Sequence, residues 1–547
     1  MGIDAGDALV QALHEHNPWW EAGAAAFELP ARQKSDFYHL ARPEEAGSQF
    51  EDQPLLGLVG RRGVGKTTLL HQFVHHRIEG GDEPERFCYL PFDADPLYQL
   101  QSDEQLRRAV RYYESRILGR IVEDGPAGSD GADGLNGRHF LLLDDVHRIE
   151  HPTKPSIDGW GVPVADLLAA DGASHAAVAE SPVDATRHVV VTASAEVQVD
   201  RELDEVEVAS STYDTQPILP EKFRDYVFGV YPDLEASQET RVSPTSLRRG
   251  EGSLPRALET GDLEQFVAEL RDKYAQVAHV ERRLQSRVVD YLAMGGTISF
   301  AQDGVVESAG DLDARDYERL REDVRDALYQ EVPGFESIQT IADLERLIAL
   351  AARNRAAEPL RYQDLVDLFD VDRRTIADSY LPALEQLYLL SGVTEYDNSR
   401  PRSVRLYLRD TGLLTALVDG DASVVRNDVE REAELAHVAG FDHTMRLAYG
   451  IDAMQGVDRA PEVQWWRGRA GEVAYVFEVG GTPVPVGLAY RAREREAARA
   501  SVAEFLEVYD GSLGLVLVGD SLQDGGPIEV VGSRVVEVPY WLYLLVA

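Results

Sequence analysis

A segment near the N-terminus has the residue types and spacing of a phosphate-binding loop. It spans Gly60–Thr67, follows the apolar run Leu55–Val59 and precedes a helical pattern over Leu69–Arg77. Its glycines would let backbone N–H groups turn toward phosphate oxygens. Lys66 would reach the β- and γ-phosphates, and the Thr67 hydroxyl would be a ligand of Mg²⁺. This strand–loop–helix order predicts a nucleoside triphosphate site, taken as Mg-ATP. The predicted ATP-binding residues are Gly60, Arg61, Arg62, Gly63, Val64, Gly65, Lys66, Thr67 and Thr68.

Two acidic residues follow a second apolar run and would complete this site. Phe140–Leu143 is continuously hydrophobic, and Asp144 and Asp145 come directly after it. Asp144 would hold Mg²⁺, and Asp145 would orient or deprotonate the attacking water. The alternative is an ordinary Asp-Asp turn after a core strand, but the phosphate-binding loop favours the functional interpretation. Most hydrolysing relatives have Glu at the second position. The shorter Asp145 therefore predicts slow turnover, because a misplacement of about 1 Å can cost roughly 100-fold in rate.

A third apolar run, from His188 to Ser194, ends in hydroxyl side chains. Thr192 or Ser194 could sense the γ-phosphate from the end of this strand, and we assign Thr192 to the catalytic step together with Asp145. Ordinary strand ends also contain threonine and serine, so a purely structural explanation stays open.

The chain is strongly acidic. Its 547 residues include 95 Asp and Glu against 54 Lys and Arg, a formal net charge of -41, and only five of the basic residues are lysines. The charge is spread along the whole chain, so in dilute salt it would destabilise the compact state by self-repulsion. At molar salt the Debye length is only about 3 Å, and this repulsion is screened. The composition resembles that of haloarchaeal proteins, which work in concentrated KCl; the alternative is an ordinary acidic protein.

Other features of the composition exclude several classes of protein. No apolar stretch approaches the roughly 18 residues of a membrane-spanning helix. The first residues, Met1–Ala12, contain no basic cluster typical of an export signal. The single cysteine, Cys88, excludes an internal disulfide and a cysteine zinc site, and its apolar neighbours indicate a packing role. We therefore expect a soluble, cytoplasmic protein with no membrane partner.

The chain after residue 230 predicts helical segments and then a second sheet. Residues 231–340 are polar and helical, and residues 341–420 have the pattern of a winged helix. Residues 425–547 begin with a helix and continue as strands, with a further helix, Arg493–Tyr509, before the last of them. These strands are expected at Val463–Trp466, Val473–Val479, Val484–Ala489 and Leu513–Val518.

The winged-helix pattern could serve DNA or protein. Arg373 and Arg374 begin its second helix, which Pro382 should end or kink. Three aspartates flank the arginines, so no basic patch forms. At molar salt, contacts with DNA phosphates also lose most of their driving force. DNA is therefore a possible but not a favoured partner, since winged helices also dock proteins.

Together these segments resemble a large family of prokaryotic AAA-superfamily ATPases with a restriction-endonuclease-like C-terminal domain. The resemblance covers most of the chain; each motif is weak alone, but their order and spacing are specific. It implies an α/β fold in which the parallel sheet of a P-loop NTPase is followed by helical and winged-helix regions and a C-terminal α/β restriction-endonuclease-like domain. The matching segments are Gly60–Leu70, Tyr89–Asp93, Leu143–Val146, Val191–Ser194, Leu219–Tyr226 and Arg405–Leu413.

The resemblance also implies domain boundaries. We expect a P-loop AAA-type ATPase domain over residues 1–230 and a helical lid or insert over 231–340. A winged-helix-like domain over 341–420 and a nuclease-like domain over 425–547 would follow.

The sequence departs from this family in its middle. The family's Gly-Gly-x-Pro-Glu element survives only as Gly295–Ser299, and residues 232–285 look inserted. Within them, Gly252–Leu258 resembles the Gly-x-Pro element of STAND-type signalling ATPases, which makes Arg256 a candidate for a γ-phosphate contact. A helix that begins at Pro255 would explain the same residues. We identify no arginine finger in the sequence.

The C-terminal domain lacks the acids that the resembled nucleases use. In that family a helical Glu, an Asp after Trp-Arg, and a Glu and a Lys on the next strand bind Mg²⁺ and activate water. Glu434, or else Glu432, is the nearest helical match, whereas Ala474, Gly487 and Ala489 stand at the other positions. The strand that carries Gly487 and Ala489 contains no acid in any register. The resemblance therefore implies an inactive nuclease domain that is retained for binding.

Two further groups of side chains favour a structural explanation. His71 and His75 are four residues apart on the helix after the loop, a spacing that can bind metal, but no third ligand completes a site. Asn17–Trp20 would anchor the N-terminal segment by packing rather than bind a ligand.

One functional hypothesis and two rivals result. The first is a slow Mg²⁺-dependent ATPase that acts as a nucleotide-controlled switch and engages an unidentified protein partner. The rivals are an ATP-coupled DNA-processing enzyme and a DNA-binding regulator without enzymatic activity. Retained nuclease acids would favour the DNA enzyme over the switch.

Overall fold

The structure is a computed structural model with two compact units, each described by itself. One unit, the N-terminal unit, comprises Met1–Leu219, Tyr329–Glu336 and Gln386–Tyr388. The other, the C-terminal unit, comprises Pro220–Leu328, Ser337–Glu385 and Leu389–Ala547. In the part of the chain that is described, no helix combines the length and apolar character needed to cross a membrane. The described residues are 8–27, 54–92, 103–119, 138–151, 154–169, 187–231, 233–234, 254–298, 300–301, 304–332, 338, 340–354, 358–455, 462–519 and 527–547.

Five parallel strands form the sheet of the N-terminal unit. They are β1 (Leu55–Val59), β2 (Phe87–Pro91), β3 (His139–Asp144), β6 (Arg187–Ala193) and β7 (Tyr213–Pro217). They pair in the order β2-β3-β6-β1-β7. Because β6 lies between β1 and β3, the carboxyl ends of these three strands meet at one edge of the sheet. This is the parallel α/β fold that the sequence predicts for a P-loop NTPase.

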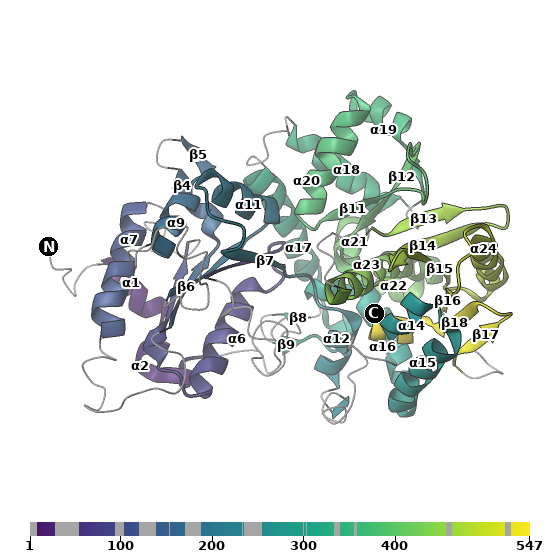
Figure 1. The fold of residues 1–547 in the computed structure, drawn as a ribbon, viewed down its shortest axis with the longest axis horizontal. Coiled ribbons are helices and arrows are strands. Elements are labelled where there is room, and N and C mark those ends of the chain that lie inside the picture. The colour runs from purple at the N-terminus through teal and green to yellow at the C-terminus, as the bar shows by residue number, and fades with distance from the viewer. Residues whose placement is uncertain are drawn as a thin grey trace. The chain divides into compact units, whose positions relative to one another are not determined.

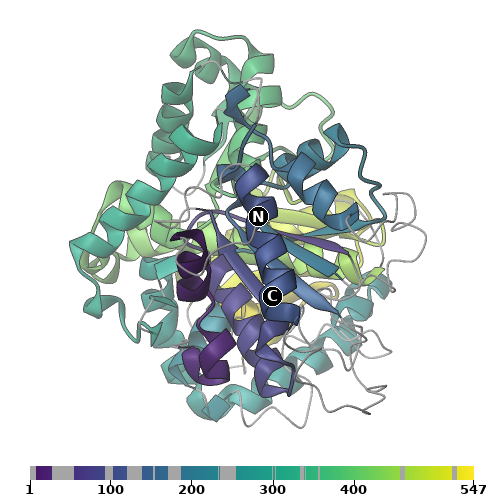
Figure 2. The same ribbon diagram turned by 90° about the vertical axis from the view of Figure 1, so that its left-hand side faces the viewer.

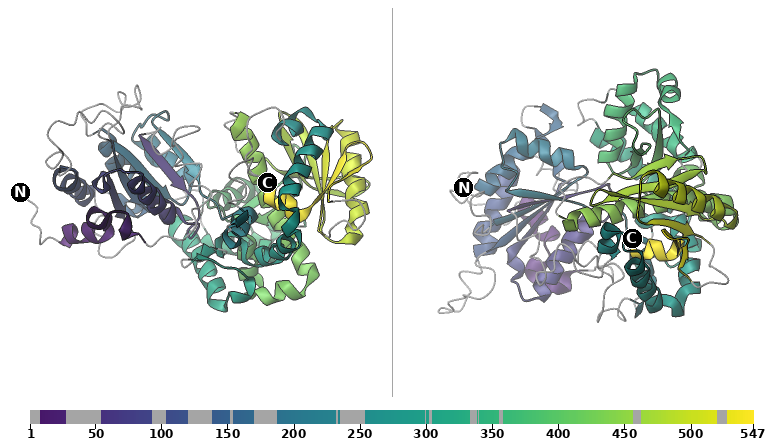
Figure 3. Two further views of the ribbon diagram at one scale, coloured as in Figure 1. Left: turned by 90° about the horizontal axis from the view of Figure 1, so that it is seen from below. Right: turned by 45° about the vertical axis from the view of Figure 1, so that its right-hand side comes forward.

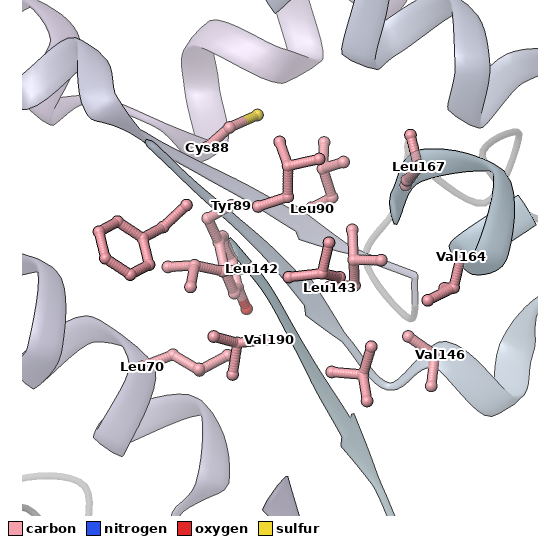
Figure 4. Packing of buried hydrophobic residues seen from close by; sticks show 14 of the residues in the cluster. Leu70, Cys88, Tyr89, Leu90, Leu142, Leu143, Val146, Val164, Leu167 and Val190 are labelled. Carbon is pink, nitrogen blue, oxygen red and sulfur yellow. The ribbon is translucent and has the colours of Figure 1, made fainter. Parts of the chain in front are cut away.

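Helices cover both faces of this sheet, as continuously apolar strands require. Figures 1 and 2 show α6 on one face of the sheet and α7, α9 and α11 on the opposite face. Figure 4 shows the packing between them, with Leu70 of α6 on one side of Leu142 and Val164 and Leu167 on the other. Cys88 on β2 is fully buried, which confirms its predicted packing role. The four helices are α6 (Lys66–Glu79), α7 (Asp103–Tyr112), α9 (Gly161–Ala169) and α11 (Glu196–Glu205).

The segment of the N-terminal helices α1 (Ala8–His16) and α2 (Trp19–Ala22) forms hydrogen bonds with backbone groups on the free edge of β2. The Asn17 side chain donates to the Tyr89 carbonyl oxygen at 2.9 Å and accepts from the Tyr89 N–H at 2.6 Å, as a neighbouring strand would. The indole N–H groups of Trp19 and Trp20 donate to the Phe87 carbonyl oxygen at 3.1 and 2.8 Å. Since an unpaired strand edge invites association, these contacts protect the sheet. They confirm the anchoring role expected of this segment.

Within the C-terminal unit, three helical segments pack with a small sheet of order β10-β12-β11. The chain remains helical past Pro382, so of the two expected outcomes, a helix end or a kink, the helix end does not occur. A π-type turn precedes the proline, and such turns are one way in which a helix accommodates a local irregularity. The elements are α18 (Ile341–Arg353), β10 (Leu360–Arg361), α19 (Tyr362–Phe369), η12 (Thr375–Tyr380), α20 (Leu381–Gln386), β11 (Leu390–Val393) and β12 (Ser403–Leu408).

A long helix, α23 (Val429–Gln455), leads into a six-stranded mixed sheet of order β13-β14-β15-β16-β18-β17. The first three strands are antiparallel, and β15, β16 and β18 run parallel. Figure 3 shows α24 along one face of this sheet. The remaining elements of this part are β13 (Gln464–Arg467), β14 (Glu472–Val479), β15 (Thr482–Ala489), α24 (Arg495–Val508), β16 (Gly514–Val518), β17 (Glu529–Val531), β18 (Val535–Pro539) and α25 (Tyr540–Val546).

Three segments that carry the family resemblance meet inside the C-terminal unit. The Asp410 carboxylate accepts from the backbone N–H groups of Thr297 at 3.0 Å and Gly412 at 2.7 Å. A Cβ at Gly296 would lie 2.1 Å from the Glu221 carbonyl oxygen, so no side chain fits there. These motif residues therefore hold helices together. Ser299 lies outside the described residues. The helices concerned and their neighbours are α12 (Phe223–Val230), α14 (Leu254–Thr260), α15 (Leu263–Val277), α16 (Glu281–Ile298), α17 (Ala314–Asp326), α21 (Thr411–Val418) and α22 (Ala422–Asn427).

Candidate functional site

The loop between β1 and α6 has a backbone suited to an anion. Helix α6 begins directly after Gly65, whose φ of 92° and ψ of 28° are left-handed. A Cβ at Gly60 would lie 2.2 Å from the Ile218 carbonyl oxygen, so glycine is required there as well. The first N–H groups of a helix have no intrahelical partner and carry a partial positive charge. The loop and the start of α6 can thus receive phosphate groups.

Lys66 is buried within this loop. Its ammonium donates to the carbonyl oxygens of Gly60 at 2.6 Å and Arg61 at 3.3 Å. An ionised phosphate is a stronger partner for an ammonium than a neutral carbonyl. The side chain is therefore placed where a phosphate on the loop can attract it.

Asp144, at the end of β3, is the centre of a hydrogen-bond cluster and is only 2% exposed. Its Oδ2 accepts from the hydroxyls of Thr67 at 2.7 Å and Tyr89 at 2.8 Å. Its Oδ1 accepts from the Thr192 hydroxyl at 2.5 Å. Thr67 and Asp144 are thus close enough to share one cation, as a Mg²⁺-nucleotide site requires. The sequence did not point to Tyr89; the signal available was a hydroxyl on the strand beside β3.

Asp145 and Thr192 are coupled through the backbone. Asp145 has a φ of 58°, a left-handed conformation that aspartate tolerates better than most residues. Its N–H donates to the Thr192 hydroxyl oxygen at 2.8 Å. Because this hydroxyl also donates to Asp144, both of its hydrogen-bonding functions are used within the protein. Thr192 is therefore placed to position the two aspartates.

Ser194 follows β6 directly and lies beside the loop, since the carbonyl oxygen of Ala193 accepts from the Gly60 N–H at 3.1 Å. The carboxyl group of Glu331, which comes from the segment η9 (Ala327–Glu331), lies close enough to the Ser194 hydroxyl for that hydroxyl to act on its pKa. Glu331 is only 6% exposed. Burial raises its pKa to about 7, with Asp145 adding to the rise and Ser194, Lys66 and Arg148 opposing it. Sequence reasoning missed Glu331, because nothing local marks it.

Cationic side chains lie near the loop. Burial, together with the charges of Arg148, Lys66 and Arg62, lowers the pKa of His147 to about 3. A histidine in this position stays neutral because the surrounding cations disfavour its protonation. The same cations would attract the negative charge of a nucleotide.

The histidine pair on α6 has packing partners. The His71 ring meets the Tyr89 ring with centroids 4.8 Å apart, and burial lowers its pKa. His75 lies 3.7 Å from Glu79 and packs against Phe27. Among the described residues, no group of three or more His, Cys, Asp or Glu is arranged to hold a metal ion. A Mg²⁺ at Thr67 and Asp144 would need phosphate and water oxygens to complete its coordination.

The acids near the predicted nuclease centre are engaged by other side chains. Glu472 accepts a hydrogen bond from Arg405 and another from Arg467, the latter at 2.7 Å. Glu434 pairs with Arg431 at 2.9 Å, and Glu432 accepts from the Tyr490 hydroxyl. A carboxylate neutralised in this way has fewer free lone pairs for a metal ion.

The strand β15 turns its small residues toward α24. A Cβ at Gly487 would lie 3.0 Å from Val502 Cγ2 and 3.4 Å from Ala498 Cβ, both on α24. On the other face of the sheet, the Tyr475 hydroxyl donates to the His437 carbonyl oxygen of α23 at 2.7 Å. Gly487 therefore faces α24 and not α23, the helix that carries Glu434 and Glu432.

The other arginines singled out in the sequence have partners or lie exposed. Arg373 donates to the Pro401 carbonyl oxygen at 2.7 Å, and its guanidinium lies 4.5 Å from the Tyr362 ring centroid. Arg374 is exposed. Arg256 pairs with Glu259 at 2.8 Å on α14. Arg373 is thus oriented by the fold itself. Of the family-like segments, Asp93, Gly252 and Ser253 lie outside the described residues.

Comparison with known proteins identifies part of the chain. Residues 52–207 match a family model described as an AAA domain, and residues 308–424 match a domain of unknown function, DUF8612. None of the curated proteins compared with the chain matches it. The chain is similar to the Orc1 protein of Aeropyrum pernix, whose structure is in complex with DNA. The two sequences are 15% identical, the match covers 74% of this chain and 97% of that chain, and the TM-score is 0.24. It is also similar to a DNA replication initiation factor. Here the sequences are 12% identical, the match covers 75% of this chain and 91% of that chain, and the TM-score is 0.19.

The matched AAA model coincides with the parallel sheet and its loop. It begins before β1 and ends after α11. The N-terminal unit thus contains an ATP-binding domain of the P-loop AAA type. The two solved structures are too distant to assign a function, because both TM-scores are low.

Proposed function

We propose that the chain is a slow, Mg²⁺-dependent ATPase that works as a nucleotide-controlled switch and engages a protein partner. The observation that carries the ATPase part is the hydrogen bond between Thr67 and Asp144 at 2.7 Å. It joins the hydroxyl at the start of α6 to the carboxylate at the end of β3, which are the two protein ligands that Mg-ATP needs in P-loop enzymes. Lys66 would bind the β- and γ-phosphates beside them.

The conformation of Asp145 supports slow turnover. In this proposal Asp145 orients the attacking water, and its left-handed backbone fixes the direction of a short side chain. Efficient hydrolysis requires the carboxylate within hydrogen-bond reach of that water. A domain that hydrolyses slowly remains in its ATP-bound state for longer, which suits a switch better than a motor.

The C-terminal sheet supports a binding role rather than DNA cleavage. The order α23, three antiparallel strands, α24 and a parallel strand is compatible with the restriction-endonuclease-like domain that the resemblance implies. The acids closest to the expected metal site, Glu472, Glu434 and Glu432, are held by arginine or tyrosine side chains. We propose that this domain has lost its metal chemistry and serves as a docking module.

DNA binding is the second candidate, favoured by the order of helices and strands over residues 341–408. Three helical segments and a sheet of order β10-β12-β11 are compatible with a winged helix. However, Arg373 is oriented by Pro401 and Tyr362, and exposed aspartates lie near it, so the helix start offers little net positive charge. We therefore place protein docking first. Retention on immobilised DNA in molar KCl would reverse this order.

Nucleotide binding is tested with two variants of the loop. Lys66→Ala and Thr67→Ala remove the phosphate partner and the metal ligand, so each should weaken Mg-ATP binding by at least about 100-fold. Thr260→Ala is a matched control, because its hydroxyl bonds only within its own helix. Isothermal titration calorimetry in molar KCl measures the affinities. Unchanged affinity in both loop variants would refute the site.

The switch is tested by its partners. Proteins that co-purify at native salt in the presence of a non-hydrolysable ATP analogue should differ from those that co-purify with ADP. The Lys66→Ala chain should behave like the ADP-loaded protein under both conditions. An identical set of partners in all three samples would contradict a nucleotide-controlled switch.

A further inference from the structure

Resting on the nucleotide site proposed above, we infer that Glu331 sets the choice between ATP and ADP by occupying the place that a γ-phosphate requires. Its buried carboxyl group lies beside the hydroxyl of Ser194, which directly follows β6 next to the phosphate-binding loop. ADP can bind while this contact is intact. ATP can bind only after Glu331 has left.

The sheet order explains why this place belongs to the γ-phosphate. In a P-loop site the terminal phosphate lies beyond the loop, between the ends of the loop strand and the strand that carries the metal-binding acid. Strand β6 lies between β1 and β3. Ser194 directly follows β6 and therefore lies at that position. The link between Gly60 N–H and the Ala193 carbonyl oxygen, at 3.1 Å, fixes the end of β6 against the loop.

A second contact holds the segment at the same edge. Arg148 donates to the Gln330 side-chain oxygen at 2.7 Å, and Arg148 lies in the short turn after Asp145. Adjacent residues of one segment thus touch the loops after β3 and after β6. These contacts come from a part of the chain far from both loops in sequence, so they depend on the fold rather than on local geometry.

The electrostatics of the site support competition between the Glu331 carboxylate and the γ-phosphate of ATP. Glu331 is almost completely buried and lies in the field of Lys66, the residue that would bind the γ-phosphate. A γ-phosphate bound to Lys66 would bring a second anion close to Glu331, and two anions repel each other strongly in a buried site because the local dielectric constant is low. Its raised pKa means that Glu331 can also be neutral near neutral pH, which eases its departure.

The position of Glu331 in the chain gives its displacement a consequence. The segment η9 continues directly from α17, which belongs to the C-terminal unit. Removing Glu331 from Ser194 would therefore release the end of η9, to which α17 is covalently connected. Through this covalent connection, the presence of the γ-phosphate can affect α17.

The test compares ATP with ADP in two variants. In Glu331→Gln the side chain loses its charge, so its contact with Ser194 weakens, its repulsion of the γ-phosphate disappears, and the affinity for a non-hydrolysable Mg-ATP analogue should rise about tenfold or more. The affinity for Mg-ADP should change less than about twofold. Gln330→Ala, which frees the segment from Arg148 without altering any charge, should raise ATP affinity severalfold. Glu322→Gln, at an exposed position on α17, is the matched control.

Hydrogen exchange provides a readout that does not depend on hydrolysis. Exchange over Tyr329–Val332 should increase in the wild-type chain with the ATP analogue and should not change with ADP. Equal ATP-to-ADP preference in wild type and Glu331→Gln would overturn the inference while leaving the nucleotide site intact. Loss of hydrolysis in Glu331→Gln with unchanged affinities would also overturn it and make Glu331 a catalytic residue. If the wild type binds neither nucleotide, the proposed function itself fails.

Discussion

The Thr67 hydroxyl donates a hydrogen bond to Asp144 Oδ2 at 2.7 Å, although 77 positions separate the two residues in the sequence. The contact joins the start of α6 to the end of β3 across the intervening strand β6. Thr192 on β6 and Tyr89 on β2 donate to the same carboxylate. Asp144 is therefore oriented from three elements at once, and changes in any of them should affect Mg²⁺ binding at the proposed site.

Thr192→Val should weaken binding of Mg-ATP and Mg-ADP alike, by about tenfold. The substitution keeps the shape of the side chain but leaves the Asp145 N–H without its acceptor and Asp144 without one donor, and such bonds to charged groups contribute about 1.5–3 kcal/mol. Thr192→Ser, which keeps the hydroxyl, is the control. A loss confined to ATP would instead assign Thr192 to sensing the γ-phosphate. Calorimetry with both nucleotides separates the two outcomes.

Asp145→Asn should leave nucleotide affinity within about twofold and reduce hydrolysis by about 100-fold or more, as expected when a group that orients or deprotonates water is removed. Asparagine also tolerates a left-handed backbone, so the turn after β3 should persist. Asp370→Asn makes the same change at another left-handed aspartate, with a φ of 55°, and should not alter the rate. Phosphate release in molar KCl measures hydrolysis. An undiminished rate in Asp145→Asn would remove Asp145 from the mechanism.

The native state should require high salt. With a net charge of -41 spread over the chain, dialysis to about 10 mM KCl lengthens the Debye length to about 30 Å and restores the self-repulsion. Circular dichroism should then lose its native signal. Sucrose in place of KCl favours compact states but does not screen charge. Because the repulsion between charges remains, sucrose should not prevent this loss. A native spectrum at low salt would contradict the prediction that the chain is adapted to molar salt.

The sequence predicted the parts of the fold that have a strong local pattern. The apolar run Leu55–Val59 coincides with β1, and the expected helix Arg493–Tyr509 differs from α24 by two residues at its start and one at its end. The loop, Thr67 and Asp144 were identified because each follows or precedes such a run. Edge strand β7 was missed because its residues, Tyr213–Pro217, are polar and only partly buried.

The missing parts of the site come from long-range contacts. Glu331 reaches Ser194 from a helical segment of ordinary composition, and no spacing within that segment points to the phosphate-binding loop. Tyr89 became significant only when the pairing of β2 with β3 was known. The face of Gly487 depends on strand parity, where a shift of one residue reverses the direction of every side chain. Such features follow from the packed fold rather than from any single segment.

Glu472→Gln should destabilise the C-terminal unit. Arg405 is 2% exposed, and Glu472 is its ionic partner, so removing that charge leaves a buried guanidinium poorly compensated, at a cost of the order of 3 kcal/mol. Burial acts to raise the pKa of Glu472, but Arg405 and Arg467 outweigh it, and the pKa is lowered. The pair therefore stabilises the fold at pH above the ordinary glutamate value, and this contribution is lost as the pH falls through the lowered pKa.

Thermal unfolding in molar KCl checks this at neutral and at acidic pH. The deficit of Glu472→Gln relative to the wild type should shrink as the pH falls below about 4. Glu478→Gln is the matched control on the same strand, because Glu478 is exposed and accepts a hydrogen bond from a neutral hydroxyl, that of Tyr396, at 3.0 Å. Equal melting temperatures for Glu472→Gln and the wild type at neutral pH would show that the ion pair is not structural.

The same ion pair predicts that the chain does not cut DNA. A nuclease of the resembled type needs carboxylates free to bind Mg²⁺ and a lysine beside them, and loss of the metal removes several kcal/mol of transition-state stabilisation. Here Glu472 is held by Arg405 and Arg467, Glu434 is paired with Arg431, and β15 offers no acid at all. DNA incubated with the protein, ATP and Mg²⁺ or Mn²⁺ in molar KCl should remain intact. Cleavage that disappears in Glu434→Gln, with the fold preserved, would contradict this and make an ATP-coupled DNA enzyme the better description.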